Sequence, residues 1–213
     1  DIVSTFECFR RQVQAGLNMA IAGIPWWTTD IGGFHGARTD DPDFHRLYIR
    51  WFEYGCFCPV MRLHGNRNPQ EGYGAEQIGS GSDNEIWSFG DKAYEISKKY
   101  IFLRERLRDY IRTQMKKAHE DGTPMMRPVF YDFPTDQESW NVEDAYLFGP
   151  DLYVAPVMED HVTEREVYLP DGTAWFNAWT GEKYEGGQNV TVAAPLDLSL
   201  IHISEPTRRR GIS

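Results

Sequence analysis

Residues 17–34 constrain the fold of this chain more than any other segment. They read LNMAIAGIPWWTTDIGGF: a short apolar run over residues 19–24 is followed by a proline, two tryptophans and one carboxylate, Asp30, in front of two glycines. A short apolar run that ends in this way is typical of a buried parallel strand whose end lies at a binding face. The pattern therefore predicts a strand over residues 19–25 and a functional loop after it.

The residue types of this segment suit a sugar ligand. An aromatic ring offers a flat apolar surface to the C–H face of a sugar, and a carboxylate accepts hydrogen bonds from its hydroxyls. Gly32 and Gly33 let the backbone come close to a ligand. Because adjacent strand residues face opposite sides, only one of Trp26 and Trp27 can face that ligand. The alternative interpretation is a core strand with aromatic packing and an aspartate that serves only a turn.

Residues 1–121 alternate predicted helices with predicted strands. This order is the repeating unit of a parallel α/β sheet or barrel, whose functional residues lie at the carboxyl ends of the strands. A polar loop over residues 65–87 is long enough to indicate a functional role. The predicted helices cover residues 5–17, 43–56 and 89–120, and the predicted strands cover residues 19–25 and 57–63.

The pattern changes after Thr123. Short apolar runs alternate there with Gly, Pro and Asp turns at a spacing of about ten residues, which is typical of an antiparallel β-sandwich. We therefore predict a domain boundary near residue 121, with a sandwich domain over residues 122–197. The runs are MMRPVFYDF, AYLFG, LYVAPV, REVYLP, AWFNAWT and NVTVAA.

Charge and composition narrow the class of partner. The chain has 22 basic and 32 acidic residues and a formal charge of −10, which disfavours a nucleic-acid partner because phosphate binding needs clustered cations. No segment predicts a membrane span. The three cysteines lack a second pair at metal-ligand spacing, so we interpret Cys8, Cys56 and Cys58 as small buried hydrophobic residues.

Five segments together resemble glycoside hydrolase family 31, the retaining α-glucosidases and α-xylosidases. The resemblance extends over residues 1–197. It implies the C-terminal portion of a (β/α)8 barrel, strands six to eight with their helices, followed by a partial antiparallel β-sandwich. The segments are DIVSTFE at 1–7, TTDIGGF at 28–34, RWFEYGCFCPVMRLHG at 50–65, EDAYLFGPDLYVAPV at 143–157 and LPDGTAWFNAWTGE at 169–182.

The same resemblance implies roles for individual residues. Asp1 corresponds to the general acid/base that follows the sixth barrel strand, although the triplet that precedes it in the family is not in this sequence. Asp30 and Phe34 correspond to sugar-subsite residues after the seventh strand, with Trp27 as a further substrate contact. His64 corresponds to the histidine after the eighth strand that contacts sugar hydroxyls. The alternatives are a terminal residue of no function for Asp1 and a core histidine for His64.

The resemblance also implies a mechanism. Retaining hydrolysis needs one carboxylate that attacks the anomeric carbon and a second, about 5–5.5 Å away, that works as acid and base. The family's nucleophile is an aspartate on the fourth strand, in a segment that lies before residue 1, so we expect the 213-residue chain itself to be inactive. Arg62 is expected to brace a carboxylate at the strand end rather than to touch substrate.

The expected activity of the complete enzyme is hydrolysis of terminal α-linked glucose or xylose from an oligosaccharide or glycoside, with retention and without cofactor or metal. The sequence does not choose between the two sugars, or between hydrolase, transglycosylase and lyase. The second hypothesis is a carbohydrate-binding or structural β-sandwich protein without catalysis, which residues 122–197 alone would support.

The C-terminal residues break the preceding pattern. The segment LSLIHISEPTR, which begins at residue 198, resembles a translated sequencing adapter, so residues 198–213 are predicted to be a non-native tail. The three arginines at 208–210 then say nothing about an acidic partner.

Overall fold

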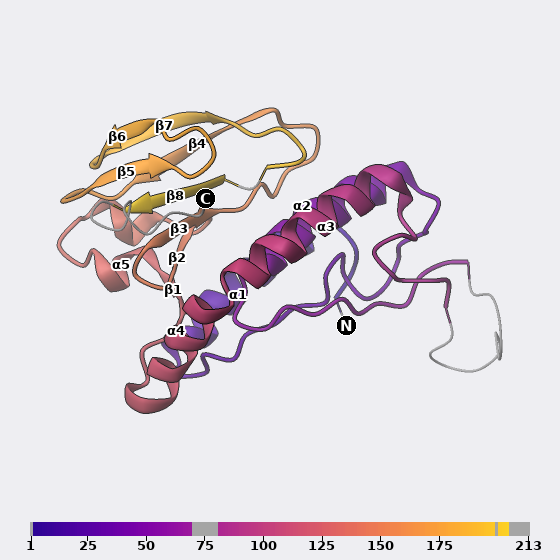
Figure 1. The fold of residues 1–213 in the computed structure, drawn as a ribbon, viewed down its shortest axis with the longest axis horizontal. Coiled ribbons are helices and arrows are strands. Elements are labelled where there is room, and N and C mark those ends of the chain that lie inside the picture. Colours follow the sequence, from indigo (N-terminus) through magenta and orange to yellow (C-terminus); the bar gives the residue numbers. More distant parts are fainter. Residues whose placement is uncertain (1, 70–80, 199, 205–213) are drawn as a thin grey trace.

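The computed structural model describes residues 2–69 and 81–198, together with the backbone of residues 200–204. Helices dominate the first half of the chain, and α2 and α3 pack side by side (Figure 1). The helices are α1 (Phe6–Ile21), α2 (Pro42–Cys56), α3 (Gly90–Arg106) and α4 (Arg108–Asp121).

Helices α1 and α2 begin, and α4 ends, at capping residues that the sequence contains. The Thr5 hydroxyl accepts a hydrogen bond from the Cys8 N–H at 3.1 Å and caps α1. The Asp41 carboxylate accepts the Asp43 N–H at 2.9 Å, and the proline that follows Asp41 begins α2. Gly122, with φ +78°, ends α4 in the left-handed conformation. The predicted starts of α1 and α2 and the predicted end of α4 are therefore confirmed to within a residue or two.

Two predicted elements are wrong, and a third, the strand over residues 57–63, is extended only in part. The strand over residues 19–25 does not form, because α1 continues to Ile21. Leu17 and Ala20 continue the buried face of the helix that Phe9 and Val13 begin. The first part of the apolar run is therefore the end of an amphipathic helix rather than a strand. The helix over residues 89–120 is divided at Leu107, whose side chain is buried in the core and whose backbone (φ −83°, ψ −2°) ends α3.

Extended segments that follow the first two helices run parallel to each other. The Val60 N–H donates to the Trp27 carbonyl at 3.0 Å, and the Ile31 N–H donates to the Arg62 carbonyl at 3.4 Å. The predicted strand over 57–63 is therefore an extended segment that begins only near residue 60 and is not assigned as a strand. Ser4 donates to the His35 carbonyl at 2.8 Å, next to the parallel bridge between Val3 and His35.

The segments around residues 2–4, 27–35 and 60–68 thus lie next to each other in chain order, with α1 and α2 as the connections. Asn66 donates its N–H to the Phe34 carbonyl at 2.8 Å, which places the third segment beside the second. Parallel neighbours joined by helices are the unit of a (β/α)8 barrel.

The second half of the chain is antiparallel, and each of the six predicted runs contains a strand. Its larger sheet has the order β1-β2-β3-β8-β5-β6, and β4 pairs with β7 in a separate ladder. A short helix, α5 (Val129–Asp132), follows β1 directly. The strands are β1 (Met126–Pro128), β2 (Tyr146–Phe148), β3 (Leu152–Ala155), β4 (Glu164–Leu169), β5 (Ala174–Asn177), β6 (Lys183–Glu185), β7 (Gln188–Ala193) and β8 (Leu200–Ser204).

The two faces of the larger sheet belong to two hydrophobic cores. Tyr146 and Phe148 of β2 pack into the core that the helices form, whereas Leu147 between them packs into a second core with residues of β4 and β7. The alternation follows from the period of two along a strand. The second half is therefore a partial β-sandwich whose larger sheet is covered by helices on its other face.

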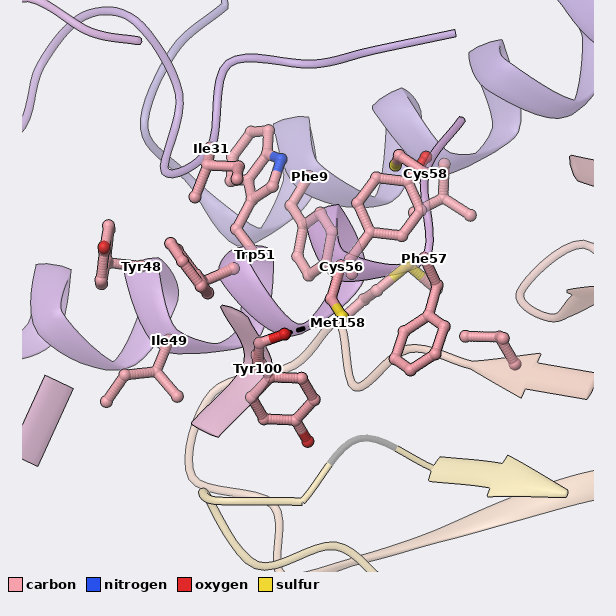
Figure 2. Close-up of a cluster of buried hydrophobic side chains, with 14 of the residues drawn as sticks. Phe9, Ile31, Tyr48, Ile49, Trp51, Cys56, Phe57, Cys58, Tyr100 and Met158 are labelled. Carbon is pink, nitrogen blue, oxygen red and sulfur yellow. Dashed lines mark hydrogen bonds between the residues drawn. The ribbon is translucent and has the colours of Figure 1, made fainter. Parts of the chain in front are cut away.

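Figure 2 shows the centre of the first core, where the rings of Phe9 and Trp51 stack with centroids 4.9 Å apart. Cys56 and Cys58 are buried and free, as predicted, and Cys56 donates its S–H to the Tyr100 carbonyl at 3.4 Å. Burial raises the pKa of both thiols to about 12. Cys8 is also free but only half-buried, so the prediction of burial is wrong for it.

The buried side chain of Arg50 joins α2 to the segment after β7. Arg50 contacts Glu53 at 3.3 Å, and both side chains are almost fully buried. The same guanidinium donates to the carbonyls of Ala194 (2.6 Å), Pro195 (3.0 Å) and Leu198 (3.3 Å). Burial raises the pKa of Glu53 to about 8. Loss of Arg50 would leave the buried Glu53 and these carbonyls without their donor, at about 1–3 kcal/mol for each unsatisfied group. Arg50 is thus one of the side chains that couple α2 to the sandwich.

The domain boundary near residue 121 stays a prediction, because the first core crosses it. The assignment of residues 198–213 to a non-native tail also stays a prediction. Residues 200–204 form β8 between β3 and β5, and residues 199 and 205–213 lie outside the described part of the chain. Among the helices described, none combines the length and apolar character that a membrane crossing requires.

We expect the isolated chain to self-associate. Ile24, Trp26 and Val60 are large apolar side chains that lie exposed on or next to the parallel segments. In gel filtration with light scattering, the wild-type chain should elute as oligomers or aggregates. The double variant W26S/V60S should shift toward monomer. A wild-type monomer with a sharp cooperative melt would contradict this expectation.

Candidate active site

The residues of the second parallel segment face alternately toward the helices and away from them. Trp27 donates its indole N–H to the Tyr54 hydroxyl of α2 at 3.1 Å, and Ile31 lies against Gly55 of the same helix. The alternate positions, Trp26 and Asp30, therefore face away from the helices. In a barrel this second face points to the interior, and substrate binds at the end of the barrel where the carboxyl ends of the strands meet.

Asp30 is the centre of a polar cluster on that face. Its side chain is one-tenth exposed, and its Oδ1 atom accepts a hydrogen bond from the guanidinium of Arg62. Nδ1 of His64 lies 3.3 Å from the same oxygen. Arg62 therefore braces a carboxylate at the strand end, as predicted. The guanidinium compensates the charge of the shielded carboxylate, which would otherwise be costly to remove from water.

Aromatic rings form a wall beside this cluster. The ring of Phe34 lies 5.1 Å from the ring of His64, with a 42° angle between the planes. It also contacts His35 edge-on at 4.4 Å. The structure thus brings together Asp30, Phe34 and His64, all named from the sequence, from the ends of two adjacent segments.

Trp27 does not join them, and its predicted contact with substrate stays a prediction. Its ring packs over Gly16 of α1, where a Cβ atom would come within 2.6 Å of the indole nitrogen. The reason is the alternation along the segment, which sends Trp27 to the helix side and Trp26 to the Asp30 side. Trp26 is 57% exposed.

Asp1, the predicted acid/base, lies outside the described residues. The residue after it, Ile2, accepts hydrogen bonds at its carbonyl from the N–H groups of Phe34 (2.6 Å) and His35 (3.0 Å). The chain next to Asp1 is therefore fixed beside the aromatic wall.

Arg67 is a structural residue of the site that the sequence reasoning missed. Its side chain is buried, and it donates to the carbonyls of Ile31 (3.0 Å) and Gly33 (2.8 Å) and to the Asn84 side chain (2.8 Å). Burial lowers the pKa of its guanidinium to about 10. Its position two residues after Gly65 carries no periodic signal from which burial could be predicted.

The turn that Arg67 holds requires glycine. Gly32 and Gly33 have φ values of +83° and +78°, in the left-handed region. A Cβ atom on Gly33 would also come within 2.8 Å of the backbone of Ser4. The turn after Asp30 is therefore fixed by backbone conformation, by the Arg67 side chain and by contact with the N-terminal segment.

The cluster can bind and orient a polyhydroxylated ligand. A carboxylate that is already paired with Arg62 and His64 accepts further hydrogen bonds, and the Phe34 ring supplies an apolar surface. Among the described residues, no group of three or more His, Cys, Asp or Glu side chains is arranged to hold a metal ion.

Comparisons with known proteins agree with this arrangement. Residues 1–114 match the family model of the glycosyl hydrolases family 31 TIM-barrel domain, and residues 122–205 match that of the glycosyl hydrolase family 31 C-terminal domain. The chain belongs to glycoside hydrolase family 31, and its fold is the C-terminal part of a TIM barrel followed by a partial antiparallel β-sandwich.

Two curated relatives and one solved structure illustrate the similarity. The alpha-xylosidase of Saccharolobus solfataricus is 36% identical over 197 residues, covering 92% of this chain and 25% of that protein. Alpha-glucosidase 2 of Bacillus thermoamyloliquefaciens is 33% identical over 206 residues, which cover 95% of this chain and 23% of that protein. The crystal structure of a GH31 alpha-xylosidase from a soil metagenome, complexed with xylose, superposes with a TM-score of 0.92 at 51% sequence identity. The match covers 97% of this chain and 31% of that chain. The chain spans about a quarter of the length of these curated relatives.

The bracing role of Arg67 can be measured in a hybrid enzyme, in which residues 1–197 replace the matching part of the soil-metagenome enzyme. R67A should lower the thermal unfolding midpoint by several degrees, since it leaves two buried carbonyls without a donor, at about 1–3 kcal/mol each. R67K should recover only part of the loss, because an ammonium group cannot reproduce the guanidinium fork.

The matched control for this measurement is R112A, which removes an exposed arginine of α4. A midpoint for R67A that equals that of R112A would show that the turn does not depend on Arg67.

Proposed function

We propose that this chain is the part of a retaining α-glycosidase that carries the sugar-binding end of the barrel and the adjoining β-sandwich. The complete enzyme removes a terminal α-linked xylose or glucose from an oligosaccharide. Because the solved relative at 51% identity is an alpha-xylosidase, α-xylosides are the first substrates to test.

The observation that supports this proposal most strongly is the Asp30 cluster. A nearly buried carboxylate, bonded to Arg62 and 3.3 Å from His64, lies on the barrel-interior face beside the ring of Phe34. In the proposed mechanism, Asp30 and His64 hold hydroxyls of the reacting sugar, and Arg62 holds the carboxylate in place. Phe34 packs against the sugar.

The covalent steps belong to two carboxylates. Asp1 donates a proton to the leaving oxygen and later takes one from the attacking water. The nucleophile, which forms the bond to the anomeric carbon, comes from another part of the barrel. The chain alone is therefore inactive in this proposal. Trp26, on the same face as Asp30, replaces Trp27 as the tryptophan available to substrate.

A non-catalytic carbohydrate-binding protein is the weaker hypothesis. It would account for the sandwich, but not for a polar cluster built at the ends of two parallel segments in the half that matches the TIM-barrel domain. The hybrid enzyme separates the two hypotheses. If it folds, it should hydrolyse an aryl α-xyloside with retention of configuration, seen by NMR of the first-formed sugar. A folded hybrid that binds xylose without turnover would favour the second hypothesis.

Asp30→Asn in the hybrid tests the assignment of the cluster. Contacts to the sugar strengthen as its ring distorts, so the substitution should lower kcat/KM more than it weakens ground-state binding. Loss of a charge-assisted hydrogen bond costs about 1.5–3 kcal/mol, which corresponds to roughly ten- to two-hundred-fold in kcat/KM.

D109N is the matched control for D30N, since Asp109 is an almost fully exposed aspartate on α4. It should leave kcat/KM unchanged. If D30N also stays within about twofold of wild type, Asp30 is a turn residue and the sugar-binding interpretation of TTDIGGF is wrong.

A further inference from the structure

A polar cleft of about 670 Å³ lies between two loops of the barrel part. One loop follows the Gly32–Gly33 turn and leads into α2, and the other precedes α3. Hydroxyl and carboxylate side chains line the cleft together with one indole ring. The lining residues used below are Thr39, Asp40, Ser82, Asp83 and Trp87.

Backbone hydrogen bonds fix the floor of this cleft. Thr39 donates its N–H to the Asn68 carbonyl at 3.0 Å, and Ser82 donates its N–H to the Arg67 carbonyl at 3.0 Å. The Ser82 hydroxyl also donates to the Pro69 carbonyl. The two loops are thus tied to the same short stretch of chain, residues 67–69, so their separation is set before any ligand binds. Pre-organisation of this kind lowers the entropic cost of binding.

The charged side of the cleft is oriented as well. Asp40 forms a two-point contact with Arg38, at 3.0 Å from Nε and 2.9 Å from Nη2. The arginine lowers the pKa of Asp40, so this carboxylate remains an acceptor for hydroxyl groups over the whole neutral range.

Trp87 supplies the aromatic surface. It is 67% exposed, the highest fraction among the large hydrophobic side chains that the described residues leave exposed. An exposed indole beside one oriented carboxylate, Asp40, and one oriented hydroxyl, Ser82, matches the two faces of a sugar ring, one of C–H groups and one of hydroxyls.

The cleft lies on the same end of the parallel segments as Asp30 and His64. Its loops continue from residues 31 and 64, where these segments end, and Arg67 connects the two places directly. The Arg67 backbone pairs with Ser82 of the cleft, and its side chain holds the carbonyls on both sides of the turn after Asp30.

We propose that this cleft binds a sugar unit on the leaving-group side of the substrate, stacked on Trp87. The inference rests on the proposed function: when the reacting sugar is the terminal one, every other unit of the oligosaccharide lies on the leaving-group side. The cleft then selects for oligosaccharides over simple glycosides, because a small leaving group does not reach it.

The test compares two substrates of the hybrid enzyme: α-xylosyl fluoride, whose leaving group is a single atom, and α-xylosyl oligosaccharides of increasing length. W87A should lower kcat/KM for at least one oligosaccharide by about tenfold, mainly through KM, as for loss of an aromatic contact at the centre of an interface. Its kcat/KM for α-xylosyl fluoride should stay within about twofold of wild type. W87F should recover much of the oligosaccharide activity, because it keeps an aromatic face.

W140A is the matched control, since Trp140 is 55% exposed on the sandwich half and does not line the cleft. W140A should leave kcat/KM unchanged for both substrates. Equal losses for both substrates in W87A, or no loss for any oligosaccharide, would overturn the proposal. A hybrid that folds but hydrolyses not even the fluoride contradicts the proposed function instead, so the two failures are distinguishable.

Discussion

The arrangement of the candidate site depends on the buried guanidinium of Arg67. It holds the carbonyls of Ile31 and Gly33, so it fixes the turn that sets the direction of the Asp30 carboxylate. It also donates to the Asn84 side chain, in the loop before α3. A rigid fork of donors suits acceptors that come from separate parts of the chain. The Asp30 cluster and the Trp87 cleft therefore share one support.

The sequence pattern singled out Asp30, a carboxylate between an apolar run and two glycines, whereas His64 was named through the family resemblance. Their roles toward a sugar stay predictions. The sequence did not show which of Trp26 and Trp27 faces the helices, because that depends on how the segment packs in the folded chain. It also failed for residues 19–21, where an apolar run fits a buried helical stripe as well as a strand. The burial of Arg67 was not predictable from the sequence. The acceptors that make it possible, among them the carbonyls of Ile31 and Gly33, come close to Arg67 only when the chain folds.

The fold class was accessible because its signals are local and repeated: capped helices, and short runs separated by turns. These local patterns do not predict how the barrel part packs against the sandwich. One face of the larger sheet packs on the helices, and Arg50 donates to carbonyls about 145 residues further along the chain. Such long-range packing couples the barrel part to the sandwich, so the sandwich supports the helices behind the site.

The central claim is that Asp30 and His64 hold the reacting sugar on the barrel-interior face. A crystal structure of the hybrid enzyme with bound xylose tests it most directly. The account predicts a xylose hydroxyl within hydrogen-bond distance of the Asp30 carboxylate and another near His64, with Arg62 still bonded to Asp30 and the sugar ring beside Phe34. A bound xylose that contacts neither Asp30 nor His64 would contradict it.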